Sequence, residues 1–379
     1  MPHKLLIIGD PDSATSGLAR IKRDVAKRIY SDLSDVFTVA TAGCGEVGDF
    51  PWKQFQLHDI GDWMIKELPY VAQKFAGDEE LIIFFLWDAS RLGWFANPDT
   101  CPDPALKSWL QTVKIKKWVY AAVDAEGPGP NGEHSYKLAE IYKGFDRVLN
   151  YSQFSANVTG YPDFLPHGID ISVFQPRDRK LARKGLITAG FGLKDDSFLI
   201  GIVGTNQTRK NWALGIQTAK ILLDRRLDVR LWLHTDVIAR HWDIGELIVD
   251  FGLQNRVLIT NANFSDEQLS WFYSACNVTL GIGLGEGAGY PLFESTACGT
   301  PVVHGNYGGG PEYLTAESLV EPVAWRYEGI YCCKRPVFRP EDWADRVQAI
   351  AGTTPVVPEH IKWENAWKEW AKWLRNFKG

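Results

Sequence analysis

The chain alternates short apolar runs with segments whose apolar positions have helical spacing. The first run, KLLIIG (Lys4–Gly9), predicts a buried strand; it is followed by the loop DPDSATSG and a helix expected over 18–30. Further strands are predicted at 37–42, 81–87, 117–123, 147–151, 198–203, 229–234, 257–260, 278–282 and 301–304. Strands that alternate with helices indicate an α/β protein with parallel sheets.

The strand-helix pattern occurs twice, and 379 residues are enough for two domains with separate cores. The segment PHGID…FQP (166–176) marks the end of the first half, and the basic run RDRKLARKG that follows is expected to be a solvated hinge. We therefore predict an N-terminal Rossmann-like domain at 1–176, a linker at 177–190, a C-terminal Rossmann-like domain at 191–358 and an amphipathic helix at 359–379.

Two segments combine apolar or aromatic positions with basic ones. Trp363, Trp367, Trp370, Leu374 and Phe377 share one face of the C-terminal helix, which favours packing on the N-terminal domain over a membrane surface. The run RIKRDVAKRI in the first predicted helix favours a solvated face, with an anionic lipid or a nucleic acid as the alternative contact.

Composition limits the class of protein. A hydrophobic content of 45%, a charged content of 23% and a net charge of −5 are typical of a soluble globular protein and argue against a general polyanion binder. The six cysteines form no C-x-x-C pair, and the sequence shows neither a signal peptide nor an apolar run of membrane-spanning length. We expect a cytoplasmic protein, with peripheral contact at the inner membrane surface left open.

The most informative stretch runs from Gly283 to Tyr313 and contains a strand end, a glycine-rich turn and a short helix. Its glycines let the backbone approach a ligand, and the free amides of the first helical turn favour a phosphate. Glu286 and Glu294 lie eight residues apart and can accept hydrogen bonds from sugar or ribose hydroxyls. The pattern predicts a site for a phosphorylated sugar compound; the alternative is an ordinary strand-turn-helix without a ligand.

The run EGAGYPLFESTACGTPVV (286–303) resembles the donor-site signature of the family 4 glycosyltransferases. Ala288 stands where that family usually has phenylalanine and Tyr290 where it usually has leucine, which bears on the choice of sugar. The resemblance implies the GT-B fold, in which two doubly wound domains bind acceptor and donor and a final helix crosses back to the first domain. It also implies a retaining, metal-independent sugar transfer from a UDP- or GDP-linked donor, with no cofactor.

The resemblance also implies residue roles. Glu294 would hold the ribose and Glu286 the sugar near the reacting centre, while Arg209 and Lys210 would stabilise the departing diphosphate; Thr205 replaces a family arginine, a loss for which we expect Arg209 to compensate. The loop with Asn263 and Phe264 corresponds to the nucleobase site. The remaining donor contacts are expected from Gly17, Gly287, Ala288, Gly289 and Tyr290.

Two loops of the first half, 87–104 and 124–135, are the candidates for the acceptor site because they leave the carboxyl ends of predicted strands. Asp124 could orient or deprotonate an acceptor hydroxyl, or could simply cap the following turn. Asp10-Pro11-Asp12 resembles the D-x-D metal motif of a different glycosyltransferase fold, but we expect no metal there.

Several alternatives remain at the level of sequence. The acceptor could be a glycan, a lipid-linked compound, a small molecule or hydroxymethylated DNA of the phage type. A nucleotide-sugar epimerase and a non-catalytic nucleotide-sugar-binding protein would share the fold. The sequence predicts no oligomeric state.

Overall fold

The computed structural model describes residues 2–58, 66–188, 192–225, 227–236, 241–261 and 263–377. The chain divides into two compact units. Unit 1 comprises Met1–His167, Gly329–Cys333 and Glu364–Gly379, and unit 2 comprises Gly168–Glu328 and Lys334–Trp363. The division in the structure falls at His167, before the boundary placed at residue 176 from the sequence.

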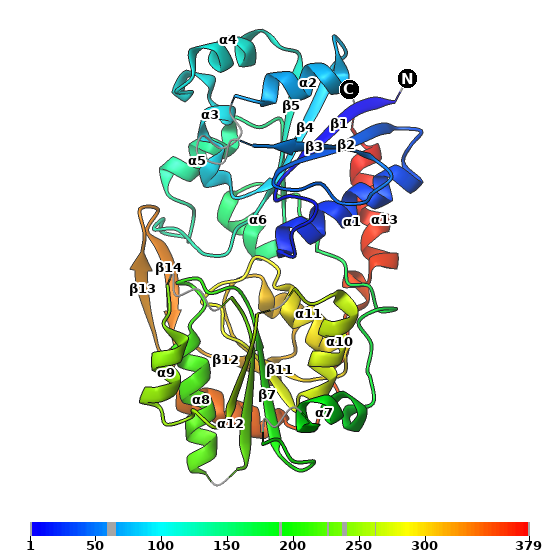
Figure 1. Cartoon of the computed structure of the whole chain (residues 1–379). Helices are drawn as coiled ribbons and strands as arrows, with labels where there is room; N and C mark the ends of the chain where they lie inside the picture. The colour runs from blue at the N-terminus through cyan, green and yellow to red at the C-terminus, as the bar shows by residue number, and fades with distance from the viewer. Residues whose placement is uncertain are drawn as a thin grey trace. The chain divides into compact units, whose positions relative to one another are not determined.

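Unit 1 is built on a six-stranded parallel sheet in the order β3-β2-β1-β4-β5-β6 (Figure 1). Its strands are β1 (His3–Ile8), β2 (Phe37–Cys44), β3 (Lys53–Leu57), β4 (Leu81–Trp87), β5 (Ile115–Ala121) and β6 (Arg147–Asn150). Its helices are α1 (Gly17–Asp32), α2 (Leu68–Ala76), α3 (Gly93–Ala96), α4 (Pro104–Thr112), α5 (Tyr136–Lys143) and α6 (Gln153–Thr159). The strand order reverses between β1 and β4, which is where ligands bind in doubly wound sheets.

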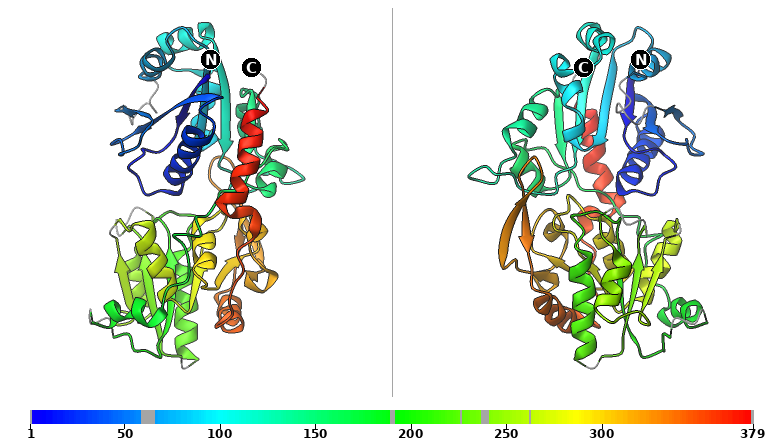
Figure 2. Two further views of the ribbon diagram at one scale, coloured as in Figure 1. Left: turned by 90° about the vertical axis from the view of Figure 1, so that its right-hand side faces the viewer. Right: turned by 60° about the vertical axis from the view of Figure 1, so that its left-hand side comes forward.

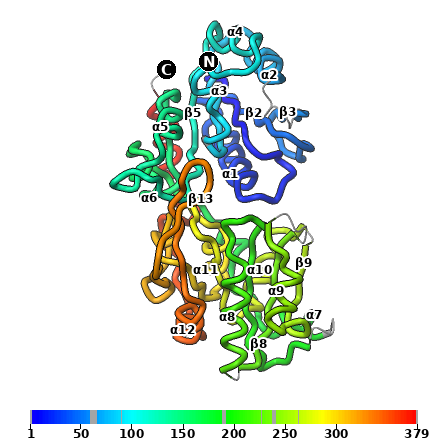
Figure 3. Tube along the Cα trace, turned by 90° about the vertical axis from the view of Figure 1, so that its left-hand side faces the viewer, coloured from blue at the N-terminus to red at the C-terminus, as the bar shows by residue number. Residues whose placement is uncertain are grey.

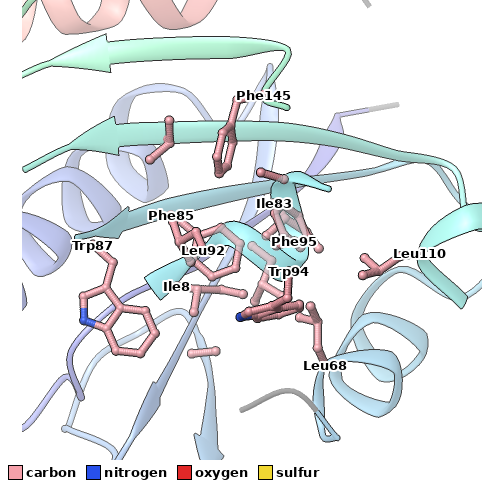
Figure 4. Close-up of a cluster of buried hydrophobic side chains, with 14 of the residues drawn as sticks. Ile8, Leu68, Ile83, Phe85, Trp87, Leu92, Trp94, Phe95, Leu110 and Phe145 are labelled. Atoms are coloured by element: carbon pink, nitrogen blue, oxygen red, sulfur yellow. The ribbon is translucent and has the colours of Figure 1, made fainter. Parts of the chain in front are cut away.

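The core of unit 1 forms around β4, whose seven residues are all buried. The ring of Phe85 meets that of Phe95 edge to face at 4.8 Å, and Trp94 packs beside them (Figure 4). Trp94 and Phe95 belong to helix α3 and pack in the core. The loop 87–104 was expected to be irregular, but part of it is therefore helical.

The C-terminal helix α13 (Trp363–Arg375) belongs to unit 1 from Glu364 onward (Figure 2). Trp370 and Leu374 are fully buried, and the Trp370 indole N–H donates to the carbonyl oxygen of Pro166 at 3.1 Å. Trp373 meets Trp118 of β5 edge to face at 5.4 Å. The tryptophan stripe is therefore packing surface, as the sequence favoured.

Unit 2 repeats the architecture with the parallel order β12-β11-β10-β7-β8-β9. Its strands are β7 (Phe198–Val203), β8 (Val229–His234), β9 (Val257–Thr260), β10 (Val278–Gly281), β11 (Val302–Gly305) and β12 (Leu319–Val320). Its helices are α7 (Arg179–Thr188), α8 (Trp212–Asp224), α9 (Ile244–Asp250), α10 (Asp266–Ala275), α11 (Tyr290–Ala297) and α12 (Pro340–Ile350). Helices α8 and α9 lie side by side over the sheet (Figure 3).

Several elements differ from the sequence predictions, including strands β3 and β12, which were not predicted. The basic run expected to be a solvated hinge forms helix α7. Its Arg183 guanidinium is buried and donates to the carbonyl oxygens of Ala275 at 2.8 Å and Ser197 at 3.1 Å. Residues 189–190 of the predicted linker lie outside the described residues. The hairpin of β13 (Ala324–Glu328) and β14 (Cys333–Val337) was not predicted. Within the described ranges, no helix combines the length and apolarity needed to cross a bilayer.

Candidate functional site

The glycine-rich turn of unit 2 connects β10 to the start of α11, as predicted. Gly289 is the N-cap of α11 with φ of 84°, a left-handed conformation that glycine adopts without strain. A Cβ on Gly283 would lie 2.2 Å from the Glu286 carboxylate, so the turn has room for that carboxylate only because residue 283 is glycine. Gly287, Ala288 and Tyr290 line the same turn and the first helical position, where backbone amides lack helical partners.

Glu286 forms ion pairs with two cations. Its carboxylate accepts hydrogen bonds from the Lys210 ammonium and, at 3.3 Å, from the Arg209 guanidinium. Burial by itself would raise the pKa of Glu286, but the two cations outweigh it and hold the pKa at about 2. The carboxylate is therefore ionised at any physiological pH, and three of the predicted site residues form one cluster, in which Glu286 and Lys210 are buried and Arg209 is partly exposed.

Backbone contacts fix the two cations beside the turn. The Leu284 N–H donates to the Arg209 carbonyl at 2.8 Å, the Asn211 N–H donates to the Ile282 carbonyl at 3.0 Å, and Lys210 makes a β-bridge with Gly283. The loop after β7 is thus attached along three consecutive residues to the turn after β10. This attachment explains why Arg209 and Lys210 point at Glu286 rather than into solvent.

A second loop, which sequence reasoning left without a role, holds the backbone of Glu286. The Gly309 N–H donates to the Glu286 carbonyl at 2.8 Å, and a Cβ on Gly308, whose φ is 83°, would lie 2.9 Å from that carbonyl oxygen. The glycine run 308–310 was visible in the sequence. Its partner was not, because the contact joins residues more than twenty positions apart.

His304, at the end of β11, lies beneath both loops. Its Nδ1–H donates to the Gly281 carbonyl at 2.6 Å, and a Cβ on Gly310 would come within 2.6 Å of its Nε2. That Nε2 is buried and has no hydrogen-bond partner in the described part of the chain. Burial lowers the pKa of His304, which keeps the imidazole neutral next to Lys210 and Glu286.

Glu294 has a different environment from Glu286. It is 2% exposed on α11, and its carboxylate accepts a hydrogen bond from the Tyr273 hydroxyl at 2.5 Å. Tyr273 lies on α10, which begins with a capping box formed by Ser265 and Gln268. Sequence reasoning missed Tyr273, since nothing in its helical spacing indicates which carboxylate it meets.

The loop expected to face a nucleobase follows β9. Its Phe264 stacks on the His234 ring at 4.2 Å with an interplanar angle of 19°, and it meets Trp232 edge to face at 6.5 Å. His234 ends β8, and its Nδ1 lies 2.9 Å from the Thr260 hydroxyl. Asn263 beside it is exposed. These residues form an aromatic surface at the carboxyl edge of the sheet in unit 2.

The other two predicted site residues, Gly17 and Asp124, belong to unit 1. Gly17 opens α1 after the N-cap Ser16, at the carboxyl edge of the sheet. Asp124 follows β5 and lies near His134. Burial lowers the pKa of His134 to about 4, and the negative charge of Asp124 opposes part of this decrease. The loop from Asp124 to His134 is held by its own backbone bonds, including Gly127 N–H to the Gly132 carbonyl at 3.0 Å.

The D-x-D sequence is explained by packing. Asp12 is buried against the Lys22 ammonium at 3.2 Å and accepts a hydrogen bond from the Thr41 hydroxyl at 2.5 Å, while Asp10 accepts one from Ser16. Over the described ranges, no group of three or more His, Cys, Asp or Glu side chains is placed to hold a metal ion.

Comparison with known proteins gives a consistent picture. Residues 186–328 match the family model described as Glycosyl transferases group 1. A D-inositol 3-phosphate glycosyltransferase of Mycobacteroides abscessus is 29% identical over 297 residues, which cover 75% of this chain and 62% of that protein. One from Paenarthrobacter aurescens is 31% identical over 191 residues, which cover 50% of this chain and 42% of that protein. The chain thus spans less than two thirds of the length of these curated relatives.

Solved structures show the same arrangement of elements. Sucrose-phosphate synthase from Thermosynechococcus elongatus superposes with a TM-score of 0.69 at 16% identity, covering 98% of each chain. Anabaena HepE in complex with UDP and glucose superposes with a TM-score of 0.67 at 15% identity, covering 99% of this chain and 100% of that one. The predicted α/β fold with two doubly wound domains is confirmed.

Proposed function

Because the chain is a GT-B protein related to the group 1 glycosyltransferases, we propose that it transfers a sugar from a nucleoside-diphosphate sugar to an acceptor hydroxyl. The observation that carries this proposal is the cluster of Arg209, Lys210 and Glu286 at the start of α11. Two cations and free helical amides suit a diphosphate, and a buried carboxylate suits the hydroxyls of the attached sugar.

UDP is the proposed nucleotide, with GDP as the alternative. HepE, a neighbour in fold, was solved with UDP and glucose and with UDP-glucose. The stacked Phe264 and His234 rings supply an aromatic surface for the base, and Glu294, held by Tyr273, supplies an acceptor for ribose hydroxyls. The backbone amides of 287–290 would complete the donor site.

The proposed reaction retains the anomeric configuration and needs no metal. Lys210 and Arg209 neutralise the charge that develops on the departing diphosphate, which is the role that a divalent cation plays in other transferases. Glu286 accepts hydrogen bonds from the sugar and orients its anomeric carbon. The acceptor hydroxyl attacks on the face from which the diphosphate leaves and passes its proton to a leaving phosphate oxygen. EDTA should therefore leave the rate unchanged.

Incubation with UDP-glucose tests the proposal, with UDP release and sugar attachment followed by mass spectrometry. The acceptor panel should contain inositol phosphates, hexose phosphates, a lipid-linked acceptor and hydroxymethylated DNA. We expect acceptor-dependent UDP release in the wild type, and loss of that release in Lys210→Ala. Release at the same rate in both proteins would refute the assignment.

A further inference from the structure

We propose that Glu286 also acts against the product: it weakens the binding of the free nucleoside diphosphate and so favours its release after sugar transfer. This inference rests on the proposed function, because it takes Arg209 and Lys210 to be the diphosphate ligands. It adds that a single carboxylate affects the affinity for the nucleoside-diphosphate sugar and the affinity for the free nucleoside diphosphate in opposite directions.

The first step of the argument is competition for the same cations. One Glu286 oxygen pairs with Lys210 and the other with Arg209, so the carboxylate occupies both groups that a diphosphate would use. Glu286 is 9% exposed and Lys210 is 8% exposed, which means that water screens their interaction only weakly. A diphosphate that binds Arg209 and Lys210 must therefore share these cations with the Glu286 carboxylate, which already contacts both.

The second step is that the carboxylate has little freedom to withdraw. The Glu286 carbonyl is held by the Gly309 N–H, and its side chain lies against Gly283, where even a methyl group would collide with it. The cations are fixed as well, through the backbone bonds between 209–211 and 282–284. Diphosphate and carboxylate therefore stay close, and their like charges repel each other.

The third step separates donor from product. A nucleoside-diphosphate sugar brings hydroxyls that donate hydrogen bonds to Glu286, which offsets the repulsion. A free nucleoside diphosphate brings no such hydroxyl and carries an additional negative charge on its terminal phosphate. The same carboxylate thus stabilises the bound donor and destabilises the bound product. Glu294 serves for comparison, because its carboxylate accepts a hydrogen bond from the Tyr273 hydroxyl.

Isothermal titration calorimetry with UDP and with UDP-glucose tests the inference on wild type, Glu286→Gln and Glu294→Gln. If the wild type binds only guanine nucleotides, GDP and GDP-glucose are used as the ligands in place of UDP and UDP-glucose. We expect Glu286→Gln to bind UDP about five to ten times more tightly than the wild type, equivalent to roughly 1 to 1.4 kcal/mol. Its affinity for UDP-glucose should stay equal or fall. The matched control Glu294→Gln should bind both compounds more weakly.

A double variant identifies the cause. Lys210→Met removes one of the two cations. Adding Glu286→Gln to Lys210→Met should raise UDP affinity by less than half of the free-energy gain that Glu286→Gln gives in the wild-type background. If Glu286→Gln does not fold, judged by circular dichroism, Glu286→Ala carries the same expectation. A folded Glu286→Gln that binds UDP no more tightly than the wild type overturns the inference while leaving the proposed function intact. A wild type that binds no nucleotide overturns the proposed function, and the inference with it.

Discussion

The Gly309 N–H donates to the carbonyl oxygen of Glu286 at 2.8 Å, so the loop after β11 fixes the residue at the centre of the proposed donor site. The loop after β7 fixes the same turn from the other side through Leu284 and Arg209. Glu286 is thus positioned by backbone on two sides before any ligand binds, which is the kind of preorganisation that transition-state stabilisation requires.

Gly308→Ala should disturb this arrangement. Alanine at a φ of 83° costs roughly 1–2 kcal/mol, and its Cβ would also collide with the Glu286 backbone. Gly252→Ala is the matched control, because Gly252 has a φ of 66° but open space around its Cβ position. Both variants should lose thermal stability, whereas only Gly308→Ala should lose affinity for UDP-glucose, whose sugar Glu286 is proposed to hold, by about tenfold. Equal UDP-glucose affinity in the two variants would show that the Gly308 contact does not position Glu286.

Lys210→Met should lower kcat by about 10²–10³, the loss that follows removal of one preorganised charge from a developing anion. The KM for the donor should change less. Lys210→Arg keeps the charge and should recover part of the rate. Steady-state kinetics with UDP-glucose provide the measurement, and a kcat within threefold of the wild type in Lys210→Met would remove Lys210 from the mechanism.

Tyr273→Phe should weaken nucleotide binding by roughly tenfold, because a hydrogen bond to a charged carboxylate contributes about 1.5 kcal/mol. The phenyl ring keeps the packing of α10 on α11, so the melting temperature should change by only a few degrees. Calorimetric titration with UDP measures the effect. Unchanged affinity would mean that the Tyr273 hydroxyl does not orient Glu294 for a ligand.

Unit 1 should lose stability as the pH falls below neutrality. Burial lowers the pKa of His134 to about 4 and that of His167 to about 3, both well below the ordinary value of 6.5. The unfolded chain therefore takes up protons that the folded chain does not, so stability present above pH 6.5 is lost as the pH falls toward those values. At pH 5 the loss should be about 3 kcal/mol in total, after allowance for the partial exposure of His134.

Urea denaturation from pH 7 to pH 5 measures this slope. His134→Asn removes one of the two groups and should make the slope shallower without abolishing it. Identical slopes in the wild type and His134→Asn would contradict the assignment of His134.

Local sequence patterns predicted most of the two sheets, because a short run rich in isoleucine and aromatic residues, such as LIIFFLW, favours a buried strand. The GT-B fold expected from the run 286–303 is confirmed by the solved structures, and residues 186–328 match the model of the group 1 glycosyltransferases. The structure brings Glu286, Arg209 and Lys210 into contact, and their predicted roles remain predictions. The predicted roles of Gly17, Asp124 and the nucleobase loop remain predictions.

What the sequence could not indicate depends on contacts between distant residues. The 308–310 loop and Tyr273 act through partners about twenty residues away, and no local pattern encodes such pairs. The sequence also did not indicate that the basic run forms helix α7, or that its Arg183 is buried and donates hydrogen bonds to backbone carbonyls. The hairpin of β13 and β14 went unnoticed because Trp325 and Tyr327 are exposed on it, so its pattern lacks a buried face.

The central claim is that unit 2 binds a nucleoside-diphosphate sugar, and thermal unfolding with a panel of UDP, GDP, ADP and their glucose derivatives tests it most directly. A ligand at about 100 times its dissociation constant adds roughly 2.7 kcal/mol to stability. The account predicts a rise in melting temperature with uracil or guanine nucleotides, and a loss of that rise in Glu294→Gln. No rise with any compound, or an equal rise in Glu294→Gln, would contradict it.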